Sequence, residues 1–190
     1  MGRLSIFVML CSVVMAIPVA RGIEKGPKAV EEWFQKLGHA EEKVTKLHFY
    51  FHDVVEGKSP TAYTVAKCNI TDKSPTFFGL LRMVDNPLTA GPKPSSRILG
   101  RAQGIYGSAG LEGVGLLMNM NFVFTDGKHN GSTLSLLARN SVFDEYREMP
   151  IVGGSGVFRL ARGIATAKTH SFNITSGNAI VKYHVTVTHY

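Results

Sequence analysis

The sequence predicts an all-β protein, an antiparallel barrel or sandwich of eight strands preceded by a short helix. Two observations support this. From residue 46 onward, apolar and polar side chains alternate with a period of two in segment after segment. Turn residues separate these segments, and no helical stretch connects them. Eight strands close into a barrel whose interior can hold one small ligand, so a binding cavity is expected.

The expected strands are bounded by clusters of Gly, Pro, Asn and Asp. Two of these clusters, Asp85-Asn86-Pro87 and Gly153-Gly154-Ser155-Gly156, are interpreted as turns between strands. The glycine cluster precedes a strand rather than a helix, so it lacks the geometry of a phosphate-binding loop. The expected strands are 46–55, 61–69, 76–85, 97–107, 112–126, 131–140, 156–169 and 178–189.

Three regions precede or form the predicted domain. A basic start followed by an almost wholly apolar stretch predicts a secretory signal peptide over 1–22, with cleavage after Ala16, Ala20 or Gly22. Residues 23–43 are expected to form a helical extension, in which Gly26-Pro27 begins a helix with an apolar face. The β domain occupies 44–190. No other long apolar run suggests a membrane span.

Cysteine content and glycosylation motifs fit secretion into the extracellular space. Cys11 is lost with the signal peptide, so Cys68 has no partner for an internal disulfide. Three Asn-X-Ser/Thr motifs predict glycosylation at Asn69, Asn130 and Asn173. Apolar residues on both faces of several strands suggest a barrel that is buried in an oligomer.

Charge and histidine spacing argue against two classes of ligand. The formal net charge is +7, but the Lys and Arg residues are scattered, so no nucleic-acid partner is expected. His48 and His52 are roughly 13 Å apart on an extended strand. No metal-binding motif of closely spaced His residues is present, so neither a metal site nor another cofactor is expected.

Asp53 is the strongest candidate for chemistry. Strand periodicity places it on the same face as Leu47, Phe49 and Phe51. A buried carboxylate without a partner is costly, and such a group shifts its pKa or finds a partner. A carboxyl group in an apolar wall can serve as an acid or base. Alternatively, Asp53 ends the strand and faces solvent, because a turn follows it.

Other polar residues accompany apolar faces. Asn140 closes the face that begins at Leu134, and Tyr106 follows a glycine-rich strand. Arg147 could neutralise a carboxylate or orient an anionic oxygen, although an ordinary ion pair with Asp144 or Glu148 would also explain it.

Four segments in order resemble the plant dirigent family. They are Leu47-His48-Phe49-Tyr50-Phe51-His52-Asp53, Gly100-Arg101-Ala102-Gln103-Gly104-Ile105-Tyr106, Tyr146-Arg147-Glu148-Met149-Pro150 and the stretch from Gly153 to Gly163. The resemblance covers about 44–189. It implies an eight-stranded barrel of the allene-oxide-cyclase-like type that is secreted to the apoplast, glycosylated and trimeric, with a dimer as an alternative.

The resemblance also implies function and site residues. Asp53 and Arg147 would be catalytic, and Tyr106, Asn140, Phe51 and Phe122 would bind the substrate. The expected function is stereocontrol of the coupling of phenoxy radicals or quinone methides to lignans, from coniferyl-type alcohols. An external laccase or peroxidase would supply the oxidation.

Two departures from the lignan-forming pattern keep alternatives open. Asn140 stands where those members carry a second aspartate, and Ser108 where they carry a second tyrosine. An amide cannot take up a proton as a carboxylate does. The first alternative is a cofactor-free isoflavanol dehydratase like the pterocarpan synthases. The second is a cell-wall protein that binds phenolics without turnover.

Overall fold

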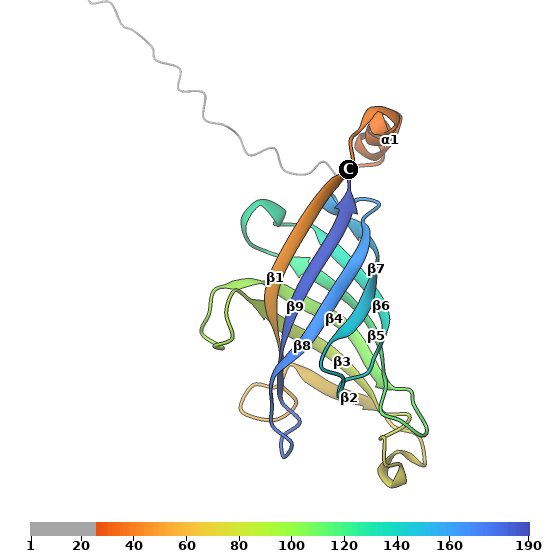
Figure 1. Cartoon of the computed structure of the whole chain (residues 1–190), viewed down its shortest axis with the longest axis vertical. Helices are drawn as coiled ribbons and strands as arrows, with labels where there is room; N and C mark the ends of the chain where they lie inside the picture. The colour runs from red at the N-terminus through yellow and green to blue at the C-terminus, as the bar shows by residue number, and fades with distance from the viewer. Residues whose placement is uncertain (1–25) are drawn as a thin grey trace, which may run out of the picture.

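The computed structural model describes residues 26–190, and the predicted signal peptide and its cleavage sites lie outside them. Within this part, one helix precedes nine strands (Figure 1). None of its helices is long and apolar enough to cross a membrane. The elements are α1 (Pro27–Lys36), β1 (Lys43–Asp53), β2 (Ala62–Ala66), β3 (Leu81–Thr89), β4 (Ile98–Ser108), β5 (Leu116–Phe124), β6 (Thr133–Asn140), β7 (Arg147–Ser155), β8 (Arg162–Phe172) and β9 (Ala179–His189).

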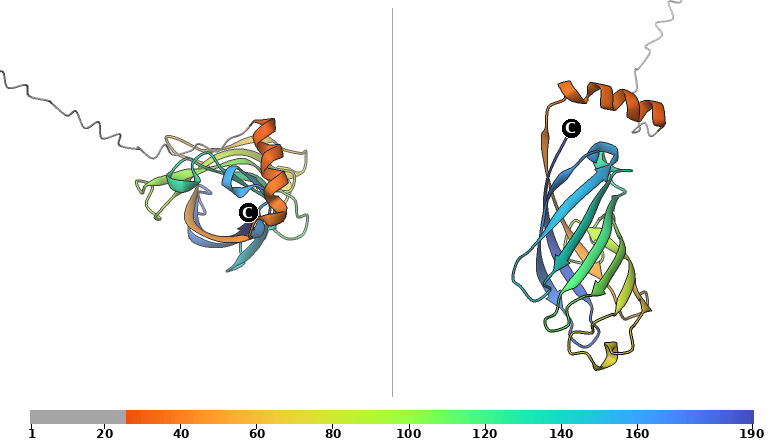
Figure 2. Two further views of the ribbon diagram at one scale, coloured as in Figure 1. Left: turned by 90° about the horizontal axis from the view of Figure 1, so that it is seen from above. Right: turned by 90° about the vertical axis from the view of Figure 1, so that its right-hand side faces the viewer.

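Eight of these strands form a closed antiparallel barrel. The hydrogen-bonded order is β1-β9-β8-β7-β6-β5-β4-β3, and β1 closes the ring on β3 through Phe51 opposite Leu88. The ring is visible when the molecule is viewed along its length (Figure 2, left). β2 is a short ninth strand that pairs only with the first half of β3. The predicted eight-stranded barrel is therefore confirmed.

The identity of the eight barrel strands differs from the sequence prediction in two places. The predicted strand 61–69 becomes the short β2, and the prediction missed β7 altogether. The Gly153-Gly154 pair was interpreted as a turn, but both residues lie within β7. A Cβ on Gly154 would lie 2.6 Å from the carbonyl oxygens of Thr133 and Phe158. Glycine is therefore needed here because neighbouring backbones approach closely, and not because the chain reverses direction.

A further difference concerns Asp85-Asn86-Pro87, which lies inside β3 and not in a turn. Pro87 is opposite Arg101 of β4. On its other edge it falls between the stretches where β2 and β1 pair with β3. The missing proline N–H therefore breaks no bond between strands, which explains how a proline is tolerated in a barrel strand.

The barrel interior is filled by apolar side chains that alternate with outward-facing residues. Among them, Phe49 packs its ring against those of Phe122 and Tyr183, with centroids 5.1 and 5.6 Å apart. Phe51 and Phe122 both belong to this core. By contrast, α1 buries none of its residues and lies across one end of the barrel (Figure 2, right). The fold is thus held by the barrel core and not by the helix.

Candidate functional site

The polar residues predicted from the sequence lie at the end of the barrel opposite α1 (Figure 1). Asp53 and Asn140 are the last residues of β1 and β6, Tyr106 is near the end of β4, and Arg147 is the first residue of β7. Because neighbouring strands are antiparallel, these positions meet at one rim. The sequence prediction therefore selected residues that the fold gathers at one end.

Asp53 accepts hydrogen bonds from two neutral donors and has no ion-pair partner within the described residues. The Tyr106 hydroxyl donates to Asp53 Oδ2 at 2.8 Å, and Asn86 Nδ2 donates to Oδ1 at 3.1 Å. The carboxyl group is partly buried. The alternative in which Asp53 turns outward at the strand end is wrong, because both carboxyl oxygens are engaged by barrel residues.

Asn86 is a site residue that the sequence analysis missed. It is fully buried on β3, and its Oδ1 accepts a hydrogen bond from the Thr61 hydroxyl at 2.5 Å. This contact fixes which side of the amide is the donor, so the NH₂ group is directed to Asp53. Asn86 was hidden by its place in an apparent Asp-Asn-Pro turn. The sequence signal that places it on an inward face is the spacing of two that it shares with Val84 and Leu88, although this spacing does not show what Asn86 contacts.

Burial is the main influence on the protonation of Asp53. It raises the pKa of the carboxyl group, and this outweighs the opposing effects of the hydrogen bonds from Tyr106 and Asn86 and of the nearby Arg82 charge. Burial and the charge of Asp53 also raise the pKa of Tyr106, so the phenol remains a proton donor. Arg82 donates to the Tyr106 hydroxyl at 3.4 Å. The arrangement can therefore present a carboxylic acid to a ligand.

Arg147 forms the second polar group of the site. It is buried, with 4% of its surface exposed, and its Nε donates to Asn140 Oδ1 at 3.2 Å. The guanidinium also donates to the Thr169 hydroxyl at 2.9 Å and, more weakly, to the Asp144 carbonyl oxygen at 3.4 Å. Burial lowers the pKa of Arg147. Ordinary ion pairing does not explain this residue, because no carboxylate contacts the guanidinium within the described part of the chain.

Asn140 thus has a defined place beside Arg147 and not beside Asp53. Its amide oxygen accepts from the cation, as a carboxylate oxygen would, but it brings no negative charge. The charge of Arg147 is therefore uncompensated at short range and is available to an anionic oxygen of a ligand. Thr169, on β8, is a second contact of this group that the sequence analysis missed.

The apolar wall of the site includes the two predicted phenylalanines. Phe51 and Phe122 have 4% and 0% of their surface exposed. Both rings contact Tyr183, at centroid distances of 5.9 and 5.5 Å. Phe51 is two residues before Asp53 on the same face of β1, so it can contact a ligand of Asp53. Phe122 lies deeper and mainly supports the wall.

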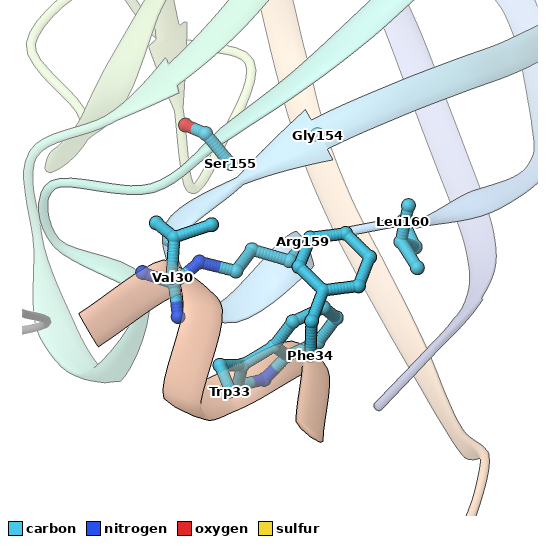
Figure 3. Close-up of a pocket in the computed structure, with 8 residues that line it drawn as sticks. Val30, Trp33, Phe34, Gly154, Ser155, Arg159 and Leu160 are labelled. Carbon is cyan, nitrogen blue, oxygen red and sulfur yellow. The ribbon is translucent and has the colours of Figure 1, made fainter. Parts of the chain in front are cut away.

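A groove at the opposite end of the barrel has a volume of about 370 Å³. It is lined by α1, by the end of β7 and by the segment that follows β7, including Trp33, Phe34 and Leu160 (Figure 3). The guanidinium of Arg159 lies 5.5 Å from the centre of the Trp33 ring. None of the predicted site residues lines it. The groove is therefore not the place where Asp53 acts.

The remaining predicted positions are on the surface. The asparagines of the three glycosylation motifs, Asn69, Asn130 and Asn173, are all exposed, as glycan attachment requires, and their modification remains a prediction. Cys68 is an exposed free thiol beside Thr71. Within residues 26–190, no group of three or more His, Cys, Asp and Glu side chains could hold a metal ion.

Comparison with known proteins agrees with the geometry. A family model described as "Dirigent-like protein" matches residues 44–188. The chain belongs to the dirigent family. It is 48% identical to dirigent protein 23 of Arabidopsis thaliana over 183 residues, which is 95% of each chain. It is 53% identical to pterocarpan synthase 1 of Glycyrrhiza echinata, over 81% of this chain and 82% of that one.

A solved structure of a pterocarpan synthase dirigent protein has the same fold. It superposes with a TM-score of 0.77 at 52% sequence identity and covers 81% of this chain and 94% of that one. The resemblance drawn from the four sequence segments is thus confirmed, including the branch with pterocarpan synthases. The relatives include both proteins named only as dirigent proteins and proteins named as synthases, so identity alone does not choose between the two activities.

Proposed function

We propose that this dirigent protein binds a phenolic molecule in the barrel and uses Asp53 as its acid and base. The activity that the site supports best is the dehydrative ring closure of an isoflavanol through a quinone methide. The observation that carries this proposal is the single carboxyl group, held by Tyr106 and Asn86 in surroundings that raise its pKa. A protonated carboxyl group can protonate a leaving hydroxyl.

The reaction requires no oxidant and balances with one carboxyl group. The substrate phenol ionises and releases its proton to solvent. Protonated Asp53 gives its proton to the alcohol oxygen, the C–O bond breaks, and water leaves to form a quinone methide. A second substrate hydroxyl then attacks the same carbon and returns its proton to the Asp53 carboxylate. The quinone oxygen becomes a phenol again by taking a proton from solvent.

Arg147 has a distinct role in this scheme. Its buried guanidinium is held by Asn140 and Thr169 and has no carboxylate beside it in the described structure. It is thus suited to bind the phenolate oxygen of the ionised substrate, since charged hydrogen bonds strengthen in a site from which water is excluded. The two groups would act at different ends of one ligand. Asp53 would protonate the alcohol oxygen, and Arg147 would bind the phenolate oxygen.

Coupling of phenoxy radicals, as in lignan formation from coniferyl-type alcohols, is the second candidate. Membership of the dirigent family favours it. An external laccase or peroxidase would form the radicals, and Asp53 would assist attack on the quinone methide. Asn140 weighs against it, because the amide leaves the site with one carboxyl group where the coupling of two substrate halves would employ two.

One pair of assays separates the candidates. Purified protein is incubated with an isoflavanol bearing the second hydroxyl, without oxidant, and in parallel with coniferyl alcohol and laccase. Both products are separated on a chiral column. Ring-closed product in the first assay supports the dehydratase. An enantiomeric excess in the coniferyl alcohol assay, with no product in the isoflavanol assay, would support coupling. If neither assay gives its product, the remaining candidate is a protein that binds phenolics without turnover.

We also propose that the protein acts in the apoplast as a glycosylated homo-oligomer, with a trimer as the expected state. Support comes from the three exposed glycosylation motifs and from exposed apolar residues on the outer faces of β5, β6 and β7, namely Leu117, Leu137 and Val152. Light scattering of the protein purified from a plant secretome tests both points. A monomer without glycan would contradict them.

A further inference from the structure

A buried phenol in the barrel has no hydrogen-bond partner among residues 26–190. Tyr183 has 1% of its surface exposed, and three aromatic rings fix its position. Phe49 stacks on it at 5.6 Å with an interplanar angle of 16°, while Phe122 and Phe51 contact it at 5.5 and 5.9 Å. Tyr183 was not among the site residues predicted from the sequence.

The unpartnered hydroxyl is exceptional in this structure. Within the described residues, every fully enclosed side-chain oxygen or nitrogen has a hydrogen-bond partner. The Tyr183 oxygen, which has none, must therefore border open space inside the barrel. A ligand that supplies the missing hydrogen-bond partner would account for this hydroxyl.

The strand register places Tyr183 in one row with Arg147. Tyr183 on β9 is opposite Ala167 on β8, and Ala167 is opposite Arg147 on β7. In this row Ala167, whose side chain is a single methyl group, is the residue between Tyr183 and Arg147. A small side chain at this position blocks the space between its two neighbours less than a larger one would.

The charges around Tyr183 agree with this placement. Burial raises its pKa most, the Arg147 charge opposes the rise, and the Asp53 charge adds to it. The hydroxyl thus senses both polar groups of the site, and it stays protonated, which makes it a hydrogen-bond donor.

We propose that Tyr183 is a further catalytic residue that donates a hydrogen bond to the phenolate oxygen of the bound substrate, together with Arg147. The inference rests on the proposed function, since it assigns the donor set for the oxygen that becomes the quinone carbonyl. Asp53 with Tyr106 and Asn86 forms the acid end, and Tyr183 with Arg147 forms the anion end. A phenolate stabilised by two donors in an apolar barrel favours departure of the alcohol oxygen.

The test uses Tyr183→Phe, which removes the hydroxyl and keeps the ring packing, with Tyr63→Phe on the exposed face of β2 as the matched control. We expect kcat on the isoflavanol to fall about 10–100-fold in Tyr183→Phe, as for the loss of one donor to a charged oxygen. The thermal midpoint should not decrease, because an unpartnered buried hydroxyl is removed. Tyr63→Phe should have the same kcat and the same thermal midpoint as the unaltered protein.

A second readout does not depend on turnover. The absorbance of bound 4-nitrophenol reports its ionisation, and we expect binding to lower the pKa of the nitrophenol. Tyr183→Phe should reverse part of that shift, while Tyr63→Phe should not. A kcat within twofold of the unaltered protein, with an unchanged nitrophenol titration, would overturn the inference. If the protein turns over no isoflavanol but the nitrophenol shift depends on Tyr183, the proposed function fails while the anion end stands.

Discussion

Asp53 owes its properties to the two neutral donors that hold it. Tyr106 and Asn86 satisfy the carboxyl oxygens, and the nearby Arg82 charge makes no direct contact, so burial dominates and raises the pKa. An arginine in direct contact would have had the opposite effect. The guanidinium of Arg147 instead donates to Asn140 and Thr169. This placement keeps the cation out of contact with Asp53, so it does not lower the pKa of the carboxyl group through a direct ion pair.

Changing Asp53→Asn should lower turnover about 100-fold or more while the fold persists, since a positioned acid contributes on that scale. The amide can still accept from Tyr106, and the cost of a buried charge disappears. Steady-state kinetics and the thermal midpoint measure the two effects. Asp85→Asn, at an exposed residue on β3 that pairs with Arg101, is the control and should retain activity. Equal activity of the two variants would remove Asp53 from the mechanism.

The pH dependence follows from the raised pKa of Asp53. The folded state binds this proton more tightly than the unfolded state, where the pKa is near the ordinary 3.8. The contribution of Asp53 to the free energy of unfolding should therefore be greatest below that value and decrease as pH rises through the folded-state pKa. Turnover should fall over the same range, because the acid loses its proton.

Titration of kcat and of chemical denaturation against pH checks this prediction. In Asp53→Asn the contribution of this group to both curves should disappear. If turnover increased as pH rose through the raised pKa, Asp53 would be required as the carboxylate at the start of the reaction, and its assignment as the initial acid would be wrong.

At the scale of elements, glycines permit the tight contact between β4 and β5. A Cβ on Gly104 would lie 2.1 Å from the Asn119 carbonyl oxygen and 2.8 Å from Met120 Cα. Both obstacles are backbone atoms of the neighbouring strand, so a side chain could be accommodated only if the strands separate. The strand that carries Tyr106 to Asp53 therefore depends on a glycine two residues before it.

Gly104→Ala should lower the free energy of unfolding by about 1–3 kcal/mol, as overpacked core positions do, and reduce turnover by shifting Tyr106. Gly153→Ala on β7 is a matched control, since nothing lies within 4 Å of its added Cβ. Denaturant titration of both variants measures the effect. Equal stability of the two would contradict the close approach of β4 and β5.

The sequence predicted the fold where strands follow a simple alternation and failed where they do not. β1 and β9 alternate regularly over eleven residues each and were found with small errors at their ends. β7 was missed because its buried residues Arg147, Met149 and Ile151 include a charge and are followed by two glycines. β3 was misplaced because its Asn86-Pro87 is typical of a turn.

The candidate site was predictable in part for a similar reason. Asp53, Tyr106, Asn140 and Arg147 lie in segments that resemble one family, so their joint role could be proposed. Asn86, Thr169 and Tyr183 join the site only through pairing between strands that are distant in sequence. No periodicity within one strand reveals which residues of β3, β8 and β9 converge on the same rim.

At the scale of the whole molecule, we expect the barrel to be stable without the helix. The barrel core excludes α1, which has no buried residue. Removing residues through Gly38 should therefore leave the thermal midpoint within a few degrees and turnover unchanged. Calorimetry and kinetics of the shortened protein test this. A large loss of stability would show that the groove between α1 and β7 contributes to folding.

The two ends of the barrel also have different tasks. The end beneath α1 carries a shallow groove, whereas the opposite rim gathers one acid, one cation and a phenol around an apolar interior. This separation leaves the rim that carries Asp53 free of α1. The central claim is that Asp53 at this rim dehydrates a bound phenolic alcohol without an oxidant.

The most direct test is a single incubation of purified protein with the isoflavanol in the absence of any oxidant, followed by chiral analysis of the product. We expect one enantiomer of the ring-closed product from the unaltered protein and none above background from Asp53→Asn. Unchanged substrate with the unaltered protein, or equal product from both proteins, would contradict it.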